Sequence, residues 1–215
     1  MKIGMINGSP KVKDSASGEL CEMLNKLLEE KNQIMDICIN SKKTEPSFLE
    51  DSYRCDAIIF VLPLYVDGIP SHLLRFMEQL QDYLMDKEPK EIYIYSIVNN
   101  GFFEGKQAIL ALQIFENWCE RSGLLWGMGV GVGAGGMLSS VRSVPLGHGP
   151  KKSLGEAYTV LVGHITKLES GVNIFINPNF PRFIYITAAH MGWKMAIKNN
   201  GLKKRDLLRQ ISSGK

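Results

Sequence analysis

The sequence lacks the side-chain patterns that mark common metalloproteins and hydrolases. Its four cysteines, Cys21, Cys38, Cys55 and Cys119, form no CxxC pair and have no metal-ligand spacing. Its four histidines are isolated from one another, and no Ser/His/Asp arrangement or GxSxG motif is present. We therefore predict no metal site and no catalytic side chain. Because each cysteine lies in or beside an apolar segment, we interpret all four as buried free thiols in a reducing compartment.

Long hydrophobic runs and a strong charge of one sign are also missing. No apolar run approaches the roughly 20 residues that a membrane helix needs, and Met1-Lys2 leads into a strand rather than a signal peptide. A net charge of +3 over 215 residues is too small to indicate nucleic acid. The run Lys203-Lys204-Arg205 with Arg209 is interpreted as a solvated helix face, with binding to an anionic surface as a minor alternative. We expect a cytoplasmic, soluble protein without nucleic-acid or membrane partners.

What the sequence does contain is a regular alternation of apolar runs and segments of helical spacing. Strands are predicted at residues 2–7, 33–39, 55–62, 91–98 and 124–132, and helices at 19–28, 71–85, 106–122 and 151–170. This order predicts an α/β fold with a doubly wound, five-stranded parallel sheet over residues 1–170. Residues 40–55 and 171–181 are predicted to be irregular. Residues 171–215 form a helical C-terminal extension, with helices at 183–199 and 202–211, packed on the core or on a partner subunit.

Three loops of this fold are expected to form a ligand site, because such sheets bind ligands beyond the carboxyl ends of their strands. These loops are residues 8–17, 63–69 and 99–104. The first joins a strand to a helix and holds Ser9, Ser15 and Ser17, which fits either an anion site or an ordinary helix cap. In the third, the phenylalanines fit either a wall for a planar ring or a cover for the core. Tyr65 in the second loop has the same two interpretations.

A fourth segment, residues 131–136, matches the pattern GxGxxG. The dinucleotide fingerprint opens a helix within a βαβ unit, whereas this segment leads into a stretch that contains Pro145, His148 and Pro150. The context therefore argues against dinucleotide binding of the Rossmann type. We predict instead a long, mobile loop over residues 133–150 near the ligand.

Taken together, the three loops resemble those of the flavodoxin-like NAD(P)H-dependent FMN reductases and multimeric flavodoxins. The resemblance rests on Gly8-Ser9-Pro10-Lys11 with Ser15 and Ser17, on residues 63–70, and on Asn100-Gly101-Phe102 with Glu104, and it covers about residues 1–170. It implies the strand order 2-1-3-4-5 and FMN as the cofactor. The residues that it implies for FMN binding are Ser9, Lys11, Ser15, Ser17, Pro63, Leu64, Tyr65, Val66, Asp67, Gly68, Asn99, Asn100, Gly101, Phe102 and Glu104.

The resemblance also implies an activity. The expected protein is an FMN-dependent oxidoreductase, a homo-oligomer that takes hydride from NAD(P)H and reduces a small acceptor such as a quinone or a flavin. The alternative is a non-enzymatic electron carrier of flavodoxin type, which is less favoured because such carriers tend to be compact and acidic. A flavin-free receiver domain is disfavoured, because Asn7-Gly8 stands where acidic Mg²⁺ ligands are needed. The chain lacks the compact cysteine cluster of the iron–sulfur flavoproteins, so no such centre is expected.

Overall fold

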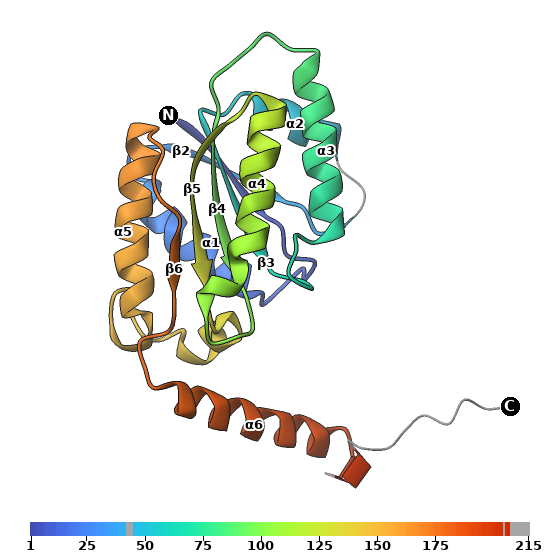
Figure 1. The fold of residues 1–215 in the computed structure, drawn as a ribbon, viewed down its shortest axis with the longest axis vertical. Helices are drawn as coiled ribbons and strands as arrows, with labels where there is room; N and C mark the ends of the chain where they lie inside the picture. The colour runs from blue at the N-terminus through green and yellow to red at the C-terminus, as the bar shows by residue number, and fades with distance from the viewer. Residues whose placement is uncertain (42–44, 204, 207–215) are drawn as a thin grey trace, which may run out of the picture. The chain divides into compact units, whose positions relative to one another are not determined.

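A computed structural model gives the fold and describes residues 1–41, 45–203 and 205–206. The chain divides into two compact units, Met1–Asn179 and the residues from Phe180 onward. The first unit contains a parallel sheet with its covering helices, and the second contains helix α6 (Figure 1).

The first unit alternates strands and helices along the chain, as the sequence predicts. Its strands are β1 (Lys2–Asn7), β2 (Gln33–Cys38), β3 (Ala57–Pro63), β4 (Tyr93–Asn99), β5 (Leu125–Val132) and β6 (Ile174–Ile176). Its α-helices are α1 (Ala16–Leu28), α2 (Pro46–Tyr53), α3 (Ser71–Met85), α4 (Ile109–Ser122) and α5 (Lys152–Lys167). Three short 3₁₀ helices complete it: η1 (Gly105–Ala108), η2 (Gly135–Val141) and η3 (Gly149–Lys151).

The sheet is parallel throughout and has the strand order β2-β1-β3-β4-β5-β6. The predicted order of the first five strands is therefore confirmed. The chain reverses direction across the sheet between β1 and β3, because β2 lies on one side of β1 and all later strands lie on the other. This is the switch point at which open α/β sheets bind ligands.

Helices cover both faces of the sheet, which explains why β3 is apolar almost throughout. Alternate β3 residues point to opposite faces: Phe60 packs in a core with residues of α3 and α4, whereas Ile59 packs in a second core with residues of α1 and α5. Both side chains are fully buried. Figure 1 shows α3 and α4 on one side of the sheet and α5 on the other.

Two elements occur where irregular chain was predicted. Helix α2 lies within residues 40–55, and Pro46, interpreted from the sequence as a break, is its first residue. Proline is well suited to this position, because the first turn needs no donor from its nitrogen. Strand β6 lies within residues 171–181 and pairs with β5 from Val130 to Val132. Its three residues are too few to show a periodicity, so only the pairing with β5 reveals the strand.

The glycines of β5 are explained by close packing rather than by nucleotide binding. A β-carbon at Gly127 would lie 2.2 Å from the Tyr95 ring, and one at Gly129 would lie 2.5 Å from Leu112. At Gly131 it would lie 2.5 Å from the carbonyl oxygen of Gly105. These contacts leave no room for a side chain at these three positions.

The second unit contains α6 (Arg182–Asn199), which matches the helix predicted at 183–199. Gly201 follows in the left-handed region with φ of +71°, and its N–H donates to the carbonyl oxygen of Lys198 at 3.0 Å. This is the expected way to end a helix at glycine. Most of the helix predicted at 202–211 lies outside the described residues.

Candidate functional site at the carboxyl edge of the sheet

The three loops predicted from the sequence leave neighbouring strands at one edge of the sheet. Residues 8–17 follow β1, residues 63–69 span the end of β3, and residues 99–104 follow β4; we call them the first, second and third loops. In the sheet register Asn7 lies opposite Val61, and Pro63 lies opposite Asn99. The strands therefore end side by side, and the structure brings the three loops together (Figure 1).

A single buried side chain, Asn99, holds the three loops to one another. Its Nδ2 donates to Ser17 Oγ at 2.8 Å and to the carbonyl oxygen of Leu62 at 2.9 Å. The carbonyl oxygen of Asn99 accepts from the N–H of Leu64 at 2.7 Å. Asn99 is only 4% exposed, so these bonds are shielded from water. They fix the start of α1, the end of β3 and the third loop in one arrangement.

Side chains of Asn7 and of the first loop itself accept hydrogen bonds from the backbone of the loop and of the start of α1. The N–H of Ser9 donates to Asn7 Oδ1 at 3.0 Å, and Ser9 Oγ accepts from the N–H of Lys11 at 3.2 Å. Ser15 is the N-cap of α1, and its Oγ accepts from the N–H of Gly18 at 3.0 Å. Ser9 and Ser15 are buried, whereas Lys11 is exposed.

Helix α3 packs against the first loop through His72 and Leu73. Nε2 of the buried His72 lies 3.1 Å from the carbonyl oxygen of Gly8, within hydrogen-bonding distance. A β-carbon at Gly8 would lie 2.5 Å from a methyl of Leu73. Gly8 is therefore needed for the loop to pack this closely on α3.

The second loop is a tight hairpin with a strained, exposed tip. Tyr65 and Gly68 exchange two backbone hydrogen bonds of 3.1 and 3.0 Å, and Val66 and Asp67 between them have φ of +48° and +59°. Glycine or asparagine normally occupies such a turn, because a β-branched residue is disfavoured at positive φ. Tyr65 is exposed, and Val66 is fully exposed. Strain of this kind clusters at ligand sites, so the hairpin is a candidate ligand contact.

The third loop is closed by Asn100. Its Oδ1 accepts from the N–H of Phe102 at 2.8 Å, and its Nδ2 donates to the carbonyl oxygen of Glu104 at 3.2 Å. Asn100 is buried, Glu104 is half-buried, and Gly101 and Phe102 are exposed. The Phe102 ring is 57% exposed, so it does not cover the core.

The glycine-rich segment after β5 packs directly against the third loop. The N–H of Gly135 donates to the carbonyl oxygen of Asn100 at 2.7 Å, and a β-carbon there would lie 2.8 Å from Asn99 Oδ1. At Gly133 a β-carbon would lie 2.1 Å from the carbonyl oxygen of Phe103. These glycines permit close backbone contact behind the candidate site.

Residues 133–150, predicted as a long, mobile loop, contain 3₁₀-helical structure. Gly135–Val141 form η2, and Arg142 Nη2 lies 3.1 Å from Oε1 of the buried Glu19 on α1. Lys151 Nζ donates to the carbonyl oxygen of Arg142 at 3.4 Å. A segment without helical periodicity is held here by contacts with α1 and η3 that no local pattern encodes.

Sequence reasoning missed Asn7 and His72 as parts of this site. Asn7 had a usable signal, because it is a polar residue at the end of a buried strand. His72 had none, since its role depends on α3 lying beside the first loop. Asn99 was chosen as a candidate ligand contact, whereas the structure gives it the buried hydrogen bonds that hold the loops together.

The cysteines lie apart from these hydrogen bonds, and two of the four differ from the prediction that all are buried, because Cys21 is only half-buried. Burial raises the pKa of Cys55 to about 11 and that of Cys119 to about 12, so both are protonated thiols at neutral pH. Cys38, by contrast, is exposed. It ends β2, which is an edge strand of the sheet. Within the described residues, no group of His, Cys, Asp and Glu side chains could hold a metal ion.

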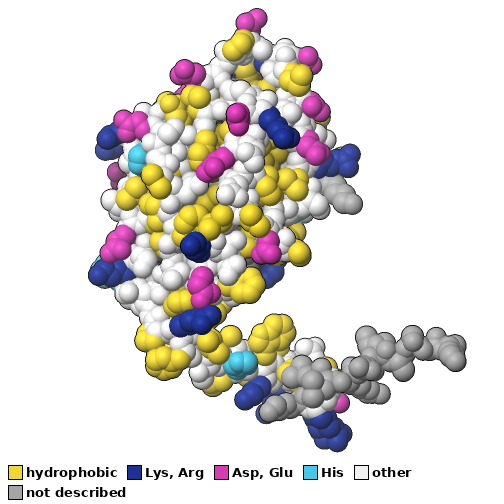
Figure 2. Space-filling view, in the orientation of Figure 1, with side chains coloured by type: hydrophobic (Ala, Val, Ile, Leu, Met, Phe, Trp, Pro, Cys, Tyr) yellow, Lys and Arg dark blue, Asp and Glu magenta, His cyan; other side chains and the backbone are white. Residues whose placement is uncertain are grey.

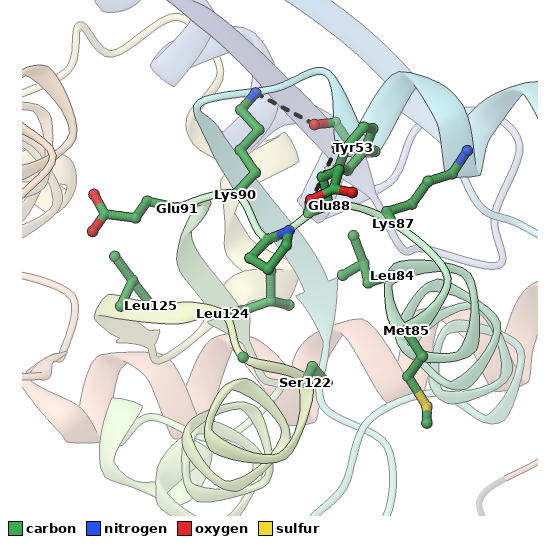
Figure 3. A pocket seen from close by; sticks show the side chains of 12 residues that line it. Tyr53, Leu84, Met85, Lys87, Glu88, Lys90, Glu91, Ser122, Leu124 and Leu125 are labelled. Atoms are coloured by element: carbon green, nitrogen blue, oxygen red, sulfur yellow. Dashed lines mark hydrogen bonds between the residues drawn. The ribbon is translucent and has the colours of Figure 1, made fainter.

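A cavity opens at the opposite, amino edge of the sheet (Figure 3). It has a volume of about 370 Å³, and its lining includes Tyr53, Lys87, Lys90 and Leu124. Lys90 Nζ donates to the carbonyl oxygens of Tyr53 and Cys55 at 3.3 and 2.7 Å. Lys87 Nζ lies 4.6 Å from the centre of the Tyr83 ring and 3.8 Å from Glu50. Both cations are engaged by the protein, so the cavity offers no free charge to an anionic ligand.

Comparisons with known proteins identify the fold. No protein family matches the sequence, and no curated protein matches it. Among solved structures, the apo form of an NADH:FMN oxidoreductase (EMOB) is 15% identical and matches 79% of this chain and 90% of its own, with a TM-score of 0.59. The azoreductase AzrA is 12% identical over 78% of this chain and 100% of its own, with a TM-score of 0.50.

A third similar structure is Smu.1420 from Streptococcus mutans UA159, which is 9% identical over 78% of this chain and 98% of its own, with a TM-score of 0.50. Together with the strand order and the helices on both faces, these likenesses show that the fold is flavodoxin-like, as the resemblance implied. The structure extends the predicted sheet by one strand, β6.

Proposed function

We propose that this protein is an FMN-dependent oxidoreductase that takes hydride from NAD(P)H and reduces a small acceptor such as a quinone or a flavin. The observation that carries this proposal is the joining of three strand-end loops by Asn99 at the switch point of a flavodoxin-like sheet. Support also comes from two structurally similar proteins, named as an NADH:FMN oxidoreductase and an azoreductase.

The first loop fits the phosphate end of FMN. Helix α1 begins at Ala16, and the first N–H groups of a helix have no partner within it and attract an anion. The hydroxyls of Ser9, Ser15 and Ser17 already accept hydrogen bonds, so each would donate its own hydrogen to the phosphate. Lys11 is exposed and would add positive charge.

The second and third loops fit the isoalloxazine ring. Tyr65 and Phe102 are exposed aromatic side chains on adjacent loops and would contact a planar ring. The remaining contacts would come from the backbone of Pro63, Leu64, Val66, Asp67 and Gly68 in the second loop, and of Asn99, Asn100, Gly101 and Glu104 in the third. A strained hairpin held at its base by the N–H of Leu64 presents these groups in a fixed position.

Bound FMN would supply the redox chemistry, accepting hydride and passing electrons onward, while the protein supplies binding and orientation. These separate roles of cofactor and protein agree with a site in which we assign no side chain as an acid or base. Buried Asn99 and Ser17 would exclude water beneath the cofactor, and the exposed aromatic residues would leave a face open to NAD(P)H and to the acceptor.

A flavodoxin-type electron carrier is the second candidate, and the charge distribution favours it more than the whole-chain charge suggests. Residues 180–215 hold eight of the 25 Lys and Arg residues but one of the 22 Asp and Glu residues, a net charge of +7. The remaining 17 basic and 21 acidic residues give residues 1–179 a net charge of −4. The sheet unit by itself is therefore mildly acidic, as carriers tend to be.

Two linked measurements test the proposal. The purified protein is titrated with FMN and followed by the visible spectrum and by quenching of flavin fluorescence. We expect stoichiometric binding of FMN and weaker binding of riboflavin, because riboflavin lacks the phosphate that the first loop would hold. If the protein binds neither flavin, the result would overturn both the proposed enzyme function and the alternative carrier function.

The second measurement separates the two candidates. The FMN-loaded protein is mixed with NADH or NADPH without oxygen, and bleaching of the flavin band is timed. If the protein is an enzyme, we expect at least one of the two nicotinamides to bleach the flavin band at a rate within the turnover range of about 1–1000 per second. Bleaching that takes minutes with both nicotinamides, but is rapid with a chemical reductant, would identify a carrier.

A further inference from the structure

Helix α6 is richer in apolar residues than a core helix of the sheet unit, yet none of its side chains is buried. Eleven of its 18 residues are Phe, Tyr, Trp, Ile, Met or Ala, whereas seven of the 16 residues of α5 are apolar. Five residues of α5 are buried, against none in α6. Figure 2 shows the yellow apolar side chains along this segment. Exposed apolar surface of this kind marks an interaction site.

The apolar side chains of α6 lie on more than one side of the helix. Because each residue turns the helix by about 100°, Met191 and Trp193 point to nearly opposite sides. Each belongs to a row of large apolar residues. The first row is Ile184, Met191 and Met195, and the second row is Ile186, Trp193 and Ile197. A helix that is apolar on opposite sides is typical of an enclosed position, not of one that lies on a single surface.

A single sheet surface would cover only one of these two rows. Helix α5 shows the pattern of a helix on one surface, because Leu161 and Ile165 are buried while Lys152, Glu156 and Thr159 are exposed. The polar residues of α6 leave no comparable polar side, since the two apolar rows lie on either side of its lysines. Among the residues that the structure describes, no helix is both long and apolar enough to cross a membrane. Two protein surfaces are therefore needed to cover α6.

The charges on the chain indicate which surface fits α6. The helix carries Arg182, Lys194 and Lys198 and has no Asp or Glu. Residues 1–179 have a net charge of −4, so the sheet unit is opposite in sign to the helix. Two α6 helices alone would repel each other, whereas the sheet unit of a second copy would offset their charge.

The sheet unit has an exposed apolar surface on α4 that could receive a helix. Among the described helices of this unit, α4 alone exposes two large apolar side chains one turn apart, Leu110 at 55% and Ile114 at 37%. Phe175 on β6 is also exposed. The start of β6 is tied to α4, because Asn173 Nδ2 donates to Glu116 Oε1 at 2.6 Å. This surface therefore combines apolar side chains with a carboxylate.

We propose that α6 is the interface helix of a homodimer. One apolar row of each α6 packs on α4 of the second copy, and the opposite row packs on the second copy's α6. The contact is two-fold symmetric, so each copy gives one helix and receives one. The acidic sheet units lie near the lysines and offset the repulsion between the two helices. Trp193 is the expected centre of the contact, because buried tryptophans dominate the binding energy of interfaces.

Sedimentation equilibrium and light scattering of the full chain test the proposal. We expect a particle of twice the 24.0 kDa of one chain. The dissociation constant should be about 10 µM or lower, as for a specific protein–protein contact. A protein that stays monomeric at every concentration up to about 1 mM would overturn the proposal.

Variants assign the contact to both sides of α6. Met191→Ser and Trp193→Ser each remove an exposed side chain from one row, so the fold should be unchanged by circular dichroism. Each should raise the dissociation constant at least about tenfold, and Leu110→Ser on α4 about fivefold. Val160→Ser is the matched control, because Val160 is an exposed apolar residue on α5 and should have no effect. A dimer that neither α6 variant weakens, or that Val160→Ser weakens equally, would overturn the assignment to α6.

Quenching of tryptophan fluorescence by acrylamide distinguishes a second copy from the chain's own sheet unit. Trp193 is 71% exposed in the single chain, whereas Trp118 is 8% exposed. We expect Trp193 to be protected from acrylamide in the dimer and to lose this protection on dilution, and Trp193→Phe should remove the change. Protection of Trp193 in a monomer, independent of concentration, would show that α6 is covered within its own chain and would overturn the proposal.

Discussion

The two edges of the sheet differ in a way that cavity size alone does not reveal. The amino edge has an open cavity of about 370 Å³, but its two lysines are engaged by backbone carbonyls, aromatic rings and carboxylates. The carboxyl edge has three loops held together by Asn99, exposed aromatic residues and a helix start. We infer that the arrangement of donors and strand ends, and not the presence of an open cavity, marks the functional edge.

The largest effect is expected from Asn99→Ala. The change leaves Ser17 Oγ and the carbonyl oxygen of Leu62 without their buried donor. We expect a loss of about 2–4 kcal/mol in the free energy of unfolding and a decrease of about 100-fold in FMN affinity. Urea unfolding and flavin fluorescence titration measure the two effects.

The control for Asn99→Ala lies at the other edge. Asn32→Ala removes an Nδ2 donor to the carbonyl oxygen of Leu28, after the end of α1. It should cost about 1 kcal/mol of stability and leave FMN affinity unchanged. If both variants weakened FMN equally, the difference between the two edges would not hold.

A smaller effect is expected from Gly135→Ala. Its new methyl would lie 2.8 Å from Asn99 Oδ1 and 3.1 Å from Asn99 Cβ, so Asn99 must shift. We expect a cost of about 1–3 kcal/mol in stability and a decrease of about tenfold in FMN affinity. Gly136→Ala is the matched control, because a β-carbon there meets nothing within 4 Å. Equal FMN affinity in the two variants would show that the glycine-rich segment does not support the site.

Ser15→Ala tests the first loop and is expected to have a smaller effect than Gly135→Ala. Removing the N-cap bond to Gly18 should cost about 1 kcal/mol of stability. FMN affinity should decrease about fivefold, whereas riboflavin affinity should not change, because the helix start faces the phosphate. Ser122→Ala removes a hydroxyl at the amino edge and should leave both affinities unchanged. An equal loss for FMN and riboflavin would mean that the first loop does not hold the phosphate.

The smallest effect is expected from Arg142→Gln. The Arg142 side chain is 60% exposed, so its ion pair with Glu19 is partly screened by solvent. We expect a loss below about 1 kcal/mol in thermal unfolding and almost no change in FMN affinity. A large loss of affinity would show that residues 133–150 contact the ligand and do more than support the third loop.

The sequence predicted the sheet because strand runs such as residues 55–62 are apolar throughout and alternate with helical segments. It could not predict β6, which has three residues and exists only through pairing with β5. Helix α2 was missed because Pro46 was interpreted as a break and not as the first residue of a helix. For β6 the local pattern was too short to indicate a strand, whereas for α2 a usable local signal was misread.

The candidate site, like the fold, could be predicted from the sequence only in part. The three loops could be located, because strand ends and turn residues are local features. The hydrogen bonds of Asn99 to Ser17 and Leu62 join residues 82 and 37 positions apart, so no spacing rule predicts them. The contact of His72 with Gly8 likewise depends on the position of α3. Sequence therefore located the loops, and only the fold showed what holds them together.

The central claim is that FMN binds at the carboxyl edge, and amide chemical shifts of the ¹⁵N-labelled full chain, recorded during titration with FMN, test it most directly. We predict that the largest changes fall in residues 9–18, 64–68 and 100–104. The amides of Lys87, Lys90 and Leu124 at the amino edge should not move. Changes centred on those amino-edge residues, or no changes at saturating FMN, would contradict the account.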